Sequence, residues 1–124
     1  MIRIVAVAFA LCLFAGLVSA ADGKLMHCFA FTAIDSASPA DWDAFYKASD
    51  ALPGKIPGLL HVWTGKLRQP LHAGEAVRQY GACMEFANEA ALTAYASSAA
   101  RKEWFAVYGK VRVPGTTTFD IVEH

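Results

Sequence analysis

The stretch Leu25-Met26-His27-Cys28-Phe29-Ala30-Phe31-Thr32-Ala33 alternates in the way that a β-strand does. Because successive strand residues point to opposite faces, His27, Phe29 and Phe31 are expected to share one face of a sheet. The opposite face then carries small or apolar side chains, namely Met26, Cys28 and Ala30. The alternation predicts a strand near the start of the domain, with an aromatic face.

A helix start follows this strand. Residues 35–39 have turn chemistry, with Ser38 at the N-cap, Pro39 at the first helical position and Asp41 in the first turn. Apolar side chains then recur at helical spacing as far as Leu52, where a Pro-Gly pair follows. The pattern predicts a helix from Pro39 to about Leu52.

The remaining residues predict three more strands and a second helical region. The strands are expected at residues 59–67, 79–86 and 116–122. Residues 68–78 are expected to form a loop. Asn88 is expected to cap a helix that breaks at Ser97 and Ser98, and a further helical piece is expected over residues 99–111.

The order of these elements is β-α-β-β-α-β, which predicts an α+β, ferredoxin-like fold. We expect a four-stranded antiparallel sheet with the spatial order 4-1-3-2 and helices on one face only. The other face, with Met26, Cys28 and Ala30, is too apolar for free solvent. Packing two such sheets face to face would cover it, which predicts a homodimer with a dimeric α/β barrel.

The beginning of the chain is typical of a signal peptide. Arg3 is followed by an apolar run over residues 4–18, and small side chains precede Ala21. The run is shorter than the ~20 residues that span a bilayer, which argues against the alternative of an uncleaved anchor. We therefore expect residues 1–20 to be a cleaved signal peptide. Residues 21–124 would form one domain, periplasmic or secreted, with no membrane attachment after cleavage.

Charge and motifs exclude several classes of function. Removing Arg3 from the eleven Lys and Arg residues leaves ten, against eleven Asp and Glu, and no basic surface stands out. This argues against nucleic acid or anionic lipid as the partner. The sequence shows no nucleophile elbow, phosphate-binding glycine loop or dinucleotide fingerprint. The histidines and cysteines lack metal-ligand spacing, so we expect no metal and no cofactor.

Several motifs resemble the stress-responsive A/B barrel domain. They are Ala51-Leu52-Pro53-Gly54-Lys55-Ile56-Pro57-Gly58-Leu59, Gly65, Met84-Glu85-Phe86, Leu92-Thr93-Ala94-Tyr95 and Phe119-Asp120. The resemblance covers nearly all of the expected mature chain, from about residue 25 to residue 122. It implies a homodimeric, ferredoxin-like barrel. Some plant relatives in this family close polyketide rings without a cofactor or metal.

The resemblance also implies a pocket between the sheet and the helices. The positions that match the pocket of cyclising relatives are His27, Phe29, Phe45, Ser49, Ala82, Tyr95 and Trp104. Many members carry a His-Pro-x-His motif after the tyrosine, and its second histidine is the acid/base. Here Ser98 and Arg101 occupy the two histidine positions. Because arginine does not release its proton near neutral pH, the cyclising chemistry is not expected of this chain.

Each candidate residue has a structural alternative. His27 is either a pocket imidazole that moves a proton or a core histidine bonded to a backbone carbonyl or to Tyr95. Arg101 either binds a carboxylate or phosphate at the pocket mouth or is a solvated helix charge paired with an acidic neighbour. The aromatic residues Phe45, Tyr95 and Trp104 either contact a bound ligand or are part of the hydrophobic core.

The two cysteines of the expected mature chain can be placed on the sheet. Cys28 and Cys83 are expected on adjacent antiparallel strands and on the same face, within disulfide reach. Export would allow a disulfide to persist, although the sequence leaves its formation open.

Together these observations favour an exported homodimer that binds a small, apolar or aromatic ligand between sheet and helices. The alternative is a cofactor-free acid/base enzyme, similar to a polyketide cyclase or a monooxygenase, that uses His27 and Tyr95. A structural dimer with a filled pocket is the remaining possibility.

Overall fold

The structure is a computed structural model that describes residues 23–124, so the expected signal peptide at residues 1–20 lies outside it. The elements in chain order are β1 (Leu25–Ala33), α1 (Pro39–Ala51), the 3-10 turn η2 (Leu52–Gly54), β2 (Leu59–Ala73), β3 (Ala76–Phe86), α2 (Glu89–Ala96), α3 (Ala99–Tyr108) and β4 (Arg112–Val122). Within the described part of the chain, no helix has the length and apolar character needed to span a membrane.

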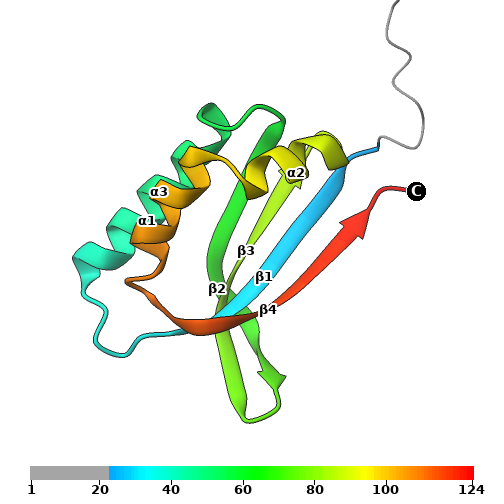
Figure 1. The fold of residues 1–124 in the computed structure, drawn as a ribbon. Helices are drawn as coiled ribbons and strands as arrows, with labels where there is room; N and C mark the ends of the chain where they lie inside the picture. Colours follow the sequence, from blue (N-terminus) through cyan, green and yellow to red (C-terminus); the bar gives the residue numbers. More distant parts are fainter. Residues whose placement is uncertain (1–22) are drawn as a thin grey trace, which may run out of the picture.

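The four strands form one antiparallel sheet in the order β2-β3-β1-β4, which confirms the predicted topology. All three helices lie over one face of this sheet, as Figure 1 shows. The predicted first helix is confirmed as well. The Ser38 side chain accepts a hydrogen bond from the Asp41 backbone, and the Asp41 carboxylate accepts one from the Ser38 backbone. This second bond lowers the pKa of Asp41.

The loop predicted at residues 68–78 is wrong. Strand β2 continues to Ala73 and β3 begins at Ala76, so the two form a long hairpin that extends beyond the rest of the sheet (Figure 1). A two-residue connection closes the hairpin, with Gly74 at φ 62°. Pro70 lies where the pairing shifts between Lys66 and Leu71, at a position where its missing N–H breaks no ladder hydrogen bond.

The boundary between the last helix and the last strand also differs from the prediction. Helix α3 ends at Tyr108 instead of near Val111, and β4 starts at Arg112 instead of Thr116. The Pro-Gly pair therefore lies inside β4, where Gly115 has φ 103° and the pairing with β1 shifts. An edge strand tolerates such an irregularity because its outer side carries no ladder.

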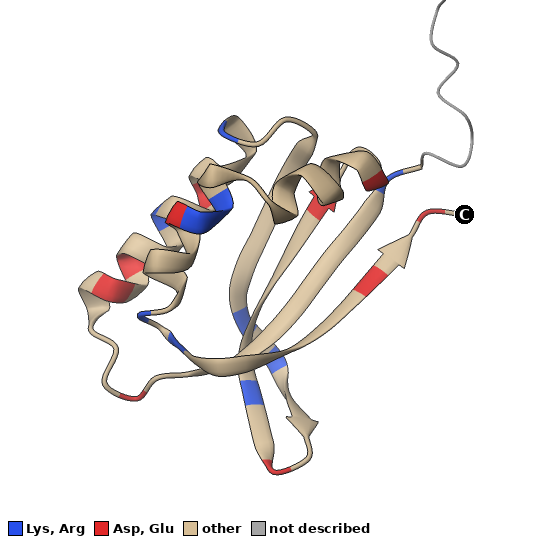
Figure 2. Ribbon diagram, in the orientation of Figure 1, with Lys and Arg blue, Asp and Glu red and all other residues tan. Residues whose placement is uncertain are grey.

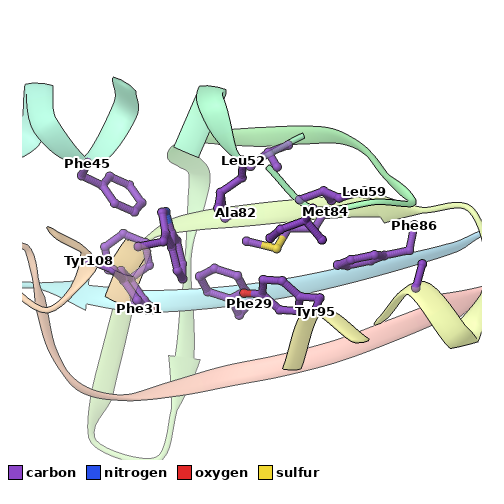
Figure 3. Packing of buried hydrophobic residues seen from close by; sticks show 14 of the residues in the cluster. Phe29, Phe31, Phe45, Leu52, Leu59, Ala82, Met84, Phe86, Tyr95 and Tyr108 are labelled. Atoms are coloured by element: carbon purple, nitrogen blue, oxygen red, sulfur yellow. The ribbon is translucent and has the colours of Figure 1, made fainter. Parts of the chain in front are cut away.

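Aromatic rings fill the space between the sheet and the helices. Figure 3 shows this cluster, in which Phe31 of β1 meets Phe45 of α1 and Tyr108 of α3 at ring-centroid distances of 5.8 and 5.2 Å. Ser49 and Trp104 add a buried polar link, because the Trp104 indole N–H donates to Ser49 Oγ at 2.9 Å. This packing fixes α1 and α3 against the sheet and sets the position of the side chains nearby.

The face of the sheet turned away from the helices, here called the open face, carries exposed apolar side chains. Trp63 of β2 is 72% exposed, and Phe119 and Ile121 of β4 are also exposed. The sequence predicts that β1 supplies the apolar side chains exposed on this face. Cys28 and Ala30 are instead buried, because β1 is a central strand flanked by β3 and β4. A shallow hollow of about 310 Å³ lies on this face between Trp63 and Phe119.

The two cysteines lie on the open face. Cys28 and Cys83 are paired directly across β1 and β3, as predicted, and the structure joins them in a disulfide. Charged residues of both signs lie on α1 and α3 on the other side of the molecule, as Figure 2 shows. The helical layer therefore has the solvated surface, and the open face the apolar one.

Candidate ligand-binding site

A pocket of about 180 Å³ opens between the sheet and the two later helices. Its lining comes from β1, α2, α3 and β4: His27, Phe29, Tyr95, Arg101, Trp104, Phe105, Tyr108, Arg112, Thr116 and Thr118. The strand residues reach it because they occupy alternate positions on the helix-facing side of the sheet. The lining combines aromatic side chains with histidine, arginine and threonine side chains.

His27 is held by an acidic residue on the neighbouring strand. Its Nδ1 lies 2.6 Å from Asp120 Oδ1, and the two residues are directly opposite in the β1–β4 register. A carboxylate only accepts hydrogen bonds, so Nδ1 carries the proton and Nε2 is the acceptor whenever the ring is neutral. The partner of His27 is therefore neither the backbone carbonyl nor the Tyr95 hydroxyl that the sequence suggested.

Tyr95 projects into the pocket from α2. This helix begins at Asn88, whose side chain accepts a hydrogen bond from the Ala91 backbone at 2.9 Å. The Tyr95 ring is 4% exposed and lies 6.5 Å from the His27 ring, centroid to centroid. Burial raises the pKa of Tyr95, and the positive charge of Arg101 opposes that rise only in part. The hydroxyl is therefore protonated at neutral pH.

Ser98 connects α2 to α3 at the edge of the pocket. Its hydroxyl donates to the Tyr95 carbonyl at 2.9 Å and accepts from the Arg101 backbone N–H at 3.1 Å. Ser98 is thus the N-cap of α3, and it fixes Arg101 in the first turn of that helix. Of the two residues that match histidine positions in the resembled family, Ser98 is a helix cap and Arg101 is a cation that lines the pocket.

The guanidinium group of Arg101 stacks on an aromatic ring instead of pairing with an acidic neighbour. Its Cζ lies 4.2 Å from the centroid of the Phe105 ring and 5.6 Å from that of Tyr95. The Arg101 Nε is buried and has no hydrogen-bond partner among the described residues. Arg101 therefore presents a positive charge to the pocket.

Tyr108 and Arg112 form the deeper polar side of the pocket. Tyr108 is 1% exposed, and the Arg112 Cζ lies 4.4 Å from the centroid of its ring. Burial strongly raises the pKa of Tyr108, and the charge of Arg112 opposes this only in part. Neither the Tyr108 hydroxyl nor Arg112 Nε has a hydrogen-bond partner within residues 23–124.

Five of the site residues predicted from the sequence meet in this pocket: His27, Phe29, Tyr95, Arg101 and Trp104. The other three do not line it. Phe45, Ser49 and Ala82 are buried in the core, where Ser49 Oγ donates to the Phe45 carbonyl and accepts from Trp104. Phe45 and Ser49 contact Trp104 of the pocket wall, whereas Ala82 pairs with Phe29 across the sheet and lines the hollow on the open face.

Sequence reasoning missed the contribution of β4 and the end of α3. The missed residues are Phe105, Tyr108, Arg112, Thr116 and Thr118 in the lining, and Asp120 beside His27. Strand parity would have found Asp120, because it pairs with His27 and lies two residues beyond Thr118 on the same face. Arg112 carried no such signal, since it was assigned to the connection between helix and strand.

The pocket combines an imidazole–carboxylate pair, two protonated phenols and two guanidinium groups around aromatic walls. Such a set can hold a planar organic molecule, exchange a proton with it and stabilise a negative charge on it. In the described part of the chain, no group of three or more His, Cys, Asp or Glu side chains could hold a metal ion.

Neither a family model nor a curated protein matches the sequence of this chain. Solved structures do match the fold. A dimeric ferredoxin-like protein of unknown function from a Jannaschia species is 20% identical, with a TM-score of 0.64 over 80% of this chain and 98% of that chain. A protein of the DABB family from Mesorhizobium loti is 23% identical, with a TM-score of 0.55 over 82% and 98% of the two chains.

An enzyme also shares the fold. Hydroxynitrile lyase from Passiflora edulis is 10% identical, with a TM-score of 0.67 over 83% of this chain and 95% of the lyase. Likenesses at these identities establish the fold alone. The chain thus has the ferredoxin-like α+β fold of the DABB protein and of the dimeric protein from Jannaschia, as its resemblance to the stress-responsive A/B barrel domain predicts.

Proposed function

We propose that the protein is an exported homodimer that binds a small, apolar or aromatic ligand in the pocket between its sheet and helices. The observation that carries this proposal is the pocket itself, whose walls include Phe29, Trp104 and Phe105. Aromatic walls with a few convergent polar groups are typical of small-molecule sites. An apolar cavity of about 150 Å³ accepts benzene, so a volume of about 180 Å³ suits a ligand with a single ring.

The open face supports the homodimer. Trp63, Phe119 and Ile121 place exposed apolar surface on one side of the sheet, while the helices cover the other side. Contiguous apolar surface of this kind marks an interaction site on a soluble protein. The structural relative from Jannaschia is dimeric, and pairing two copies of this chain through their open faces would bury these side chains.

Two features support export. Residues 1–20 have the pattern of a signal peptide, and the domain carries a disulfide between Cys28 and Cys83. Disulfides persist in oxidising compartments such as the periplasm and the extracellular space.

A second candidate function is cofactor-free acid/base catalysis on the bound ligand. The observation that favours it is the hydrogen bond between His27 and Asp120, which fixes the tautomer and orientation of an imidazole at the pocket. Tyr95 would supply a second, protonated group beside it. In this scheme, His27 would accept a proton from the ligand and Asp120 would stabilise the resulting imidazolium.

Blocking the pocket tests the proposed function. Thr118 is exposed at the pocket mouth, so Thr118→Trp is expected to fill the pocket without disturbing the core. Thr93→Trp, at an exposed position of α2 outside the lining, is the matched control. Ligand-observed NMR with a set of one-ring compounds, both neutral and acidic, should show binding to the wild type and to Thr93→Trp but not to Thr118→Trp. Binding that survives in Thr118→Trp, or no binding by any variant, would overturn the proposal.

A further inference from the structure

The two arginines of the pocket have no carboxylate partner. The ion pairs found among residues 23–124 are Lys24–Glu85, His27–Asp120 and Lys47–Asp43. Neither Arg101 nor Arg112 takes part in them. The Asp120 carboxylate is bonded to His27, and no acidic residue is among the residues that line the pocket. With a neutral His27, the polar side of the pocket therefore has a positive charge.

Both guanidinium groups approach the same aromatic ring from different elements. The Arg101 Cζ, on α3, lies 4.2 Å from the Phe105 ring centroid, and the Arg112 Cζ, at the start of β4, lies 5.5 Å from it. Each arginine also lies against a tyrosine, Arg101 against Tyr95 and Arg112 against Tyr108. Both cations therefore lie within 5.5 Å of one ring of the pocket lining, and each also lies beside a tyrosine ring.

Several polar atoms in this part of the pocket are buried without a partner. They are Arg101 Nε, Arg112 Nε and the Tyr108 hydroxyl. A buried donor without a partner costs free energy, and the cost is larger for a charged group. An arginine elsewhere in the chain shows the usual solution, since Arg78 donates to the hydroxyls of Thr32 and Thr117. Both arginines line the pocket and have no carboxylate partner within residues 23–124, so an anion there would compensate their charge.

We propose that the pocket binds a small aromatic carboxylic acid, with the carboxylate between Arg101 and Arg112 and the ring against the aromatic wall. This inference rests on the proposed function, because it names the class of ligand for the same pocket. The planar fork of a guanidinium group matches the two oxygens of a carboxylate. The aromatic walls favour an organic acid over inorganic phosphate, which shares the charge but has no apolar part.

Calorimetry with three probes distinguishes binding of an aromatic carboxylate from binding of an uncharged ring or of an inorganic anion. Benzoate has the ring and the charge, benzamide has the ring without the charge, and inorganic phosphate has the charge without the ring. We expect benzoate to bind the wild-type protein at least tenfold more tightly than benzamide or phosphate. Arg101→Gln and Arg112→Gln should each weaken benzoate binding at least tenfold and leave benzamide binding within a factor of about three.

Lys102→Gln is the matched control, because Lys102 is an exposed cation on the same helix outside the pocket. It should bind benzoate as the wild type does, and thermal unfolding of each variant checks that it is folded. Equal binding of benzoate and benzamide would overturn the carboxylate inference and leave the proposed pocket in place. Tighter binding of phosphate than of benzoate would also overturn it. If none of the three probes binds and the one-ring set fails as well, the proposed function falls with it.

Discussion

His27 and Asp120 lie on paired positions of adjacent strands, with 2.6 Å between Nδ1 and Oδ1. The pair joins β1 to the edge strand β4 at the mouth of the pocket. Because the carboxylate requires a proton on Nδ1, it selects the imidazole tautomer that leaves Nε2 as an acceptor. A ligand in the pocket would therefore meet an imidazole of defined orientation.

Removing the Asp120 carboxylate should allow neutral His27 to adopt the other tautomer. We predict that neutral His27 is protonated at Nδ1 in the wild type and mainly at Nε2 in Asp120→Ala, because the acceptor that selects Nδ1 is lost. Nitrogen NMR of the imidazoles at mildly alkaline pH measures the change. The internal control is His61, which is exposed on β2 with its ring beside Trp63 and should not respond. An unchanged His27 tautomer in the variant would show that Asp120 does not set it.

Tyr108 should make the protein sensitive to alkaline pH. Its pKa is raised in the folded state, so the native protein retains a proton that the unfolded chain releases near pH 10. The associated stability is present below about pH 10 and is lost as the pH rises further toward the folded-state pKa. In Tyr108→Phe we expect the free energy of unfolding to fall less above pH 10, by about 1–3 kcal/mol.

Denaturant unfolding at a series of pH values tests this prediction. Near neutral pH, Tyr108→Phe should be at least as stable as the wild type, because the substitution removes a buried hydroxyl that has no hydrogen-bond partner within the described chain. An identical alkaline fall in both proteins would contradict the account of Tyr108.

The disulfide should be present in the exported protein. We predict that thiol counting on unfolded, unreduced mature protein finds no free thiol, and two after reduction. Replacing both residues, as Cys28→Ala/Cys83→Ala, should lower the free energy of unfolding by about 2–4 kcal/mol, because the bond closes a long loop in the unfolded chain. Two free thiols before reduction would show that the bond does not form.

The open face should carry the dimer contact. We predict that the wild type is a dimer by light scattering at micromolar concentration and that Ile121→Lys is a monomer, because the substitution places a charge on the apolar face. Val122→Lys is the matched control, since Val122 is the next residue, is also exposed and points to the other side of the sheet. A monomeric wild type, or equal effects of the two substitutions, would argue against this face.

The fold could be predicted from the sequence because its signals are local. Alternation in β1, the capping residues of α1 and α2, and the parity of Cys28 and Cys83 all depend on neighbouring residues, and all are found in the structure. The long hairpin was missed because Pro70 and Gly74 are usually loop signals. Here Pro70 lies at a shift in the β2–β3 pairing, and Gly74 lies in a tight turn.

The pocket could be predicted only in part, because its residues come from four separate elements. His27, Phe29 and Tyr95 were found through parity and the family resemblance. Arg112 was not found, since its place in the pocket depends on how early β4 begins after α3. Ser49 was expected in the lining, but its hydroxyl instead satisfies the buried Trp104 indole. Whether Ser49 lines the pocket or bonds to a core residue depends on side-chain packing, which a sequence pattern does not reveal.

Ligands are expected to bind in the pocket beside His27 and not in the hollow on the open face. The tryptophans distinguish the two, because Trp104 lines the pocket and Trp63 lines the hollow. The direct measurement is a titration of nitrogen-labelled protein with benzoate, followed through the indole N–H resonances. We predict a saturable shift of the Trp104 resonance that is absent in Thr118→Trp, with Trp63 unchanged. A shift of Trp63 with Trp104 unchanged would contradict the account.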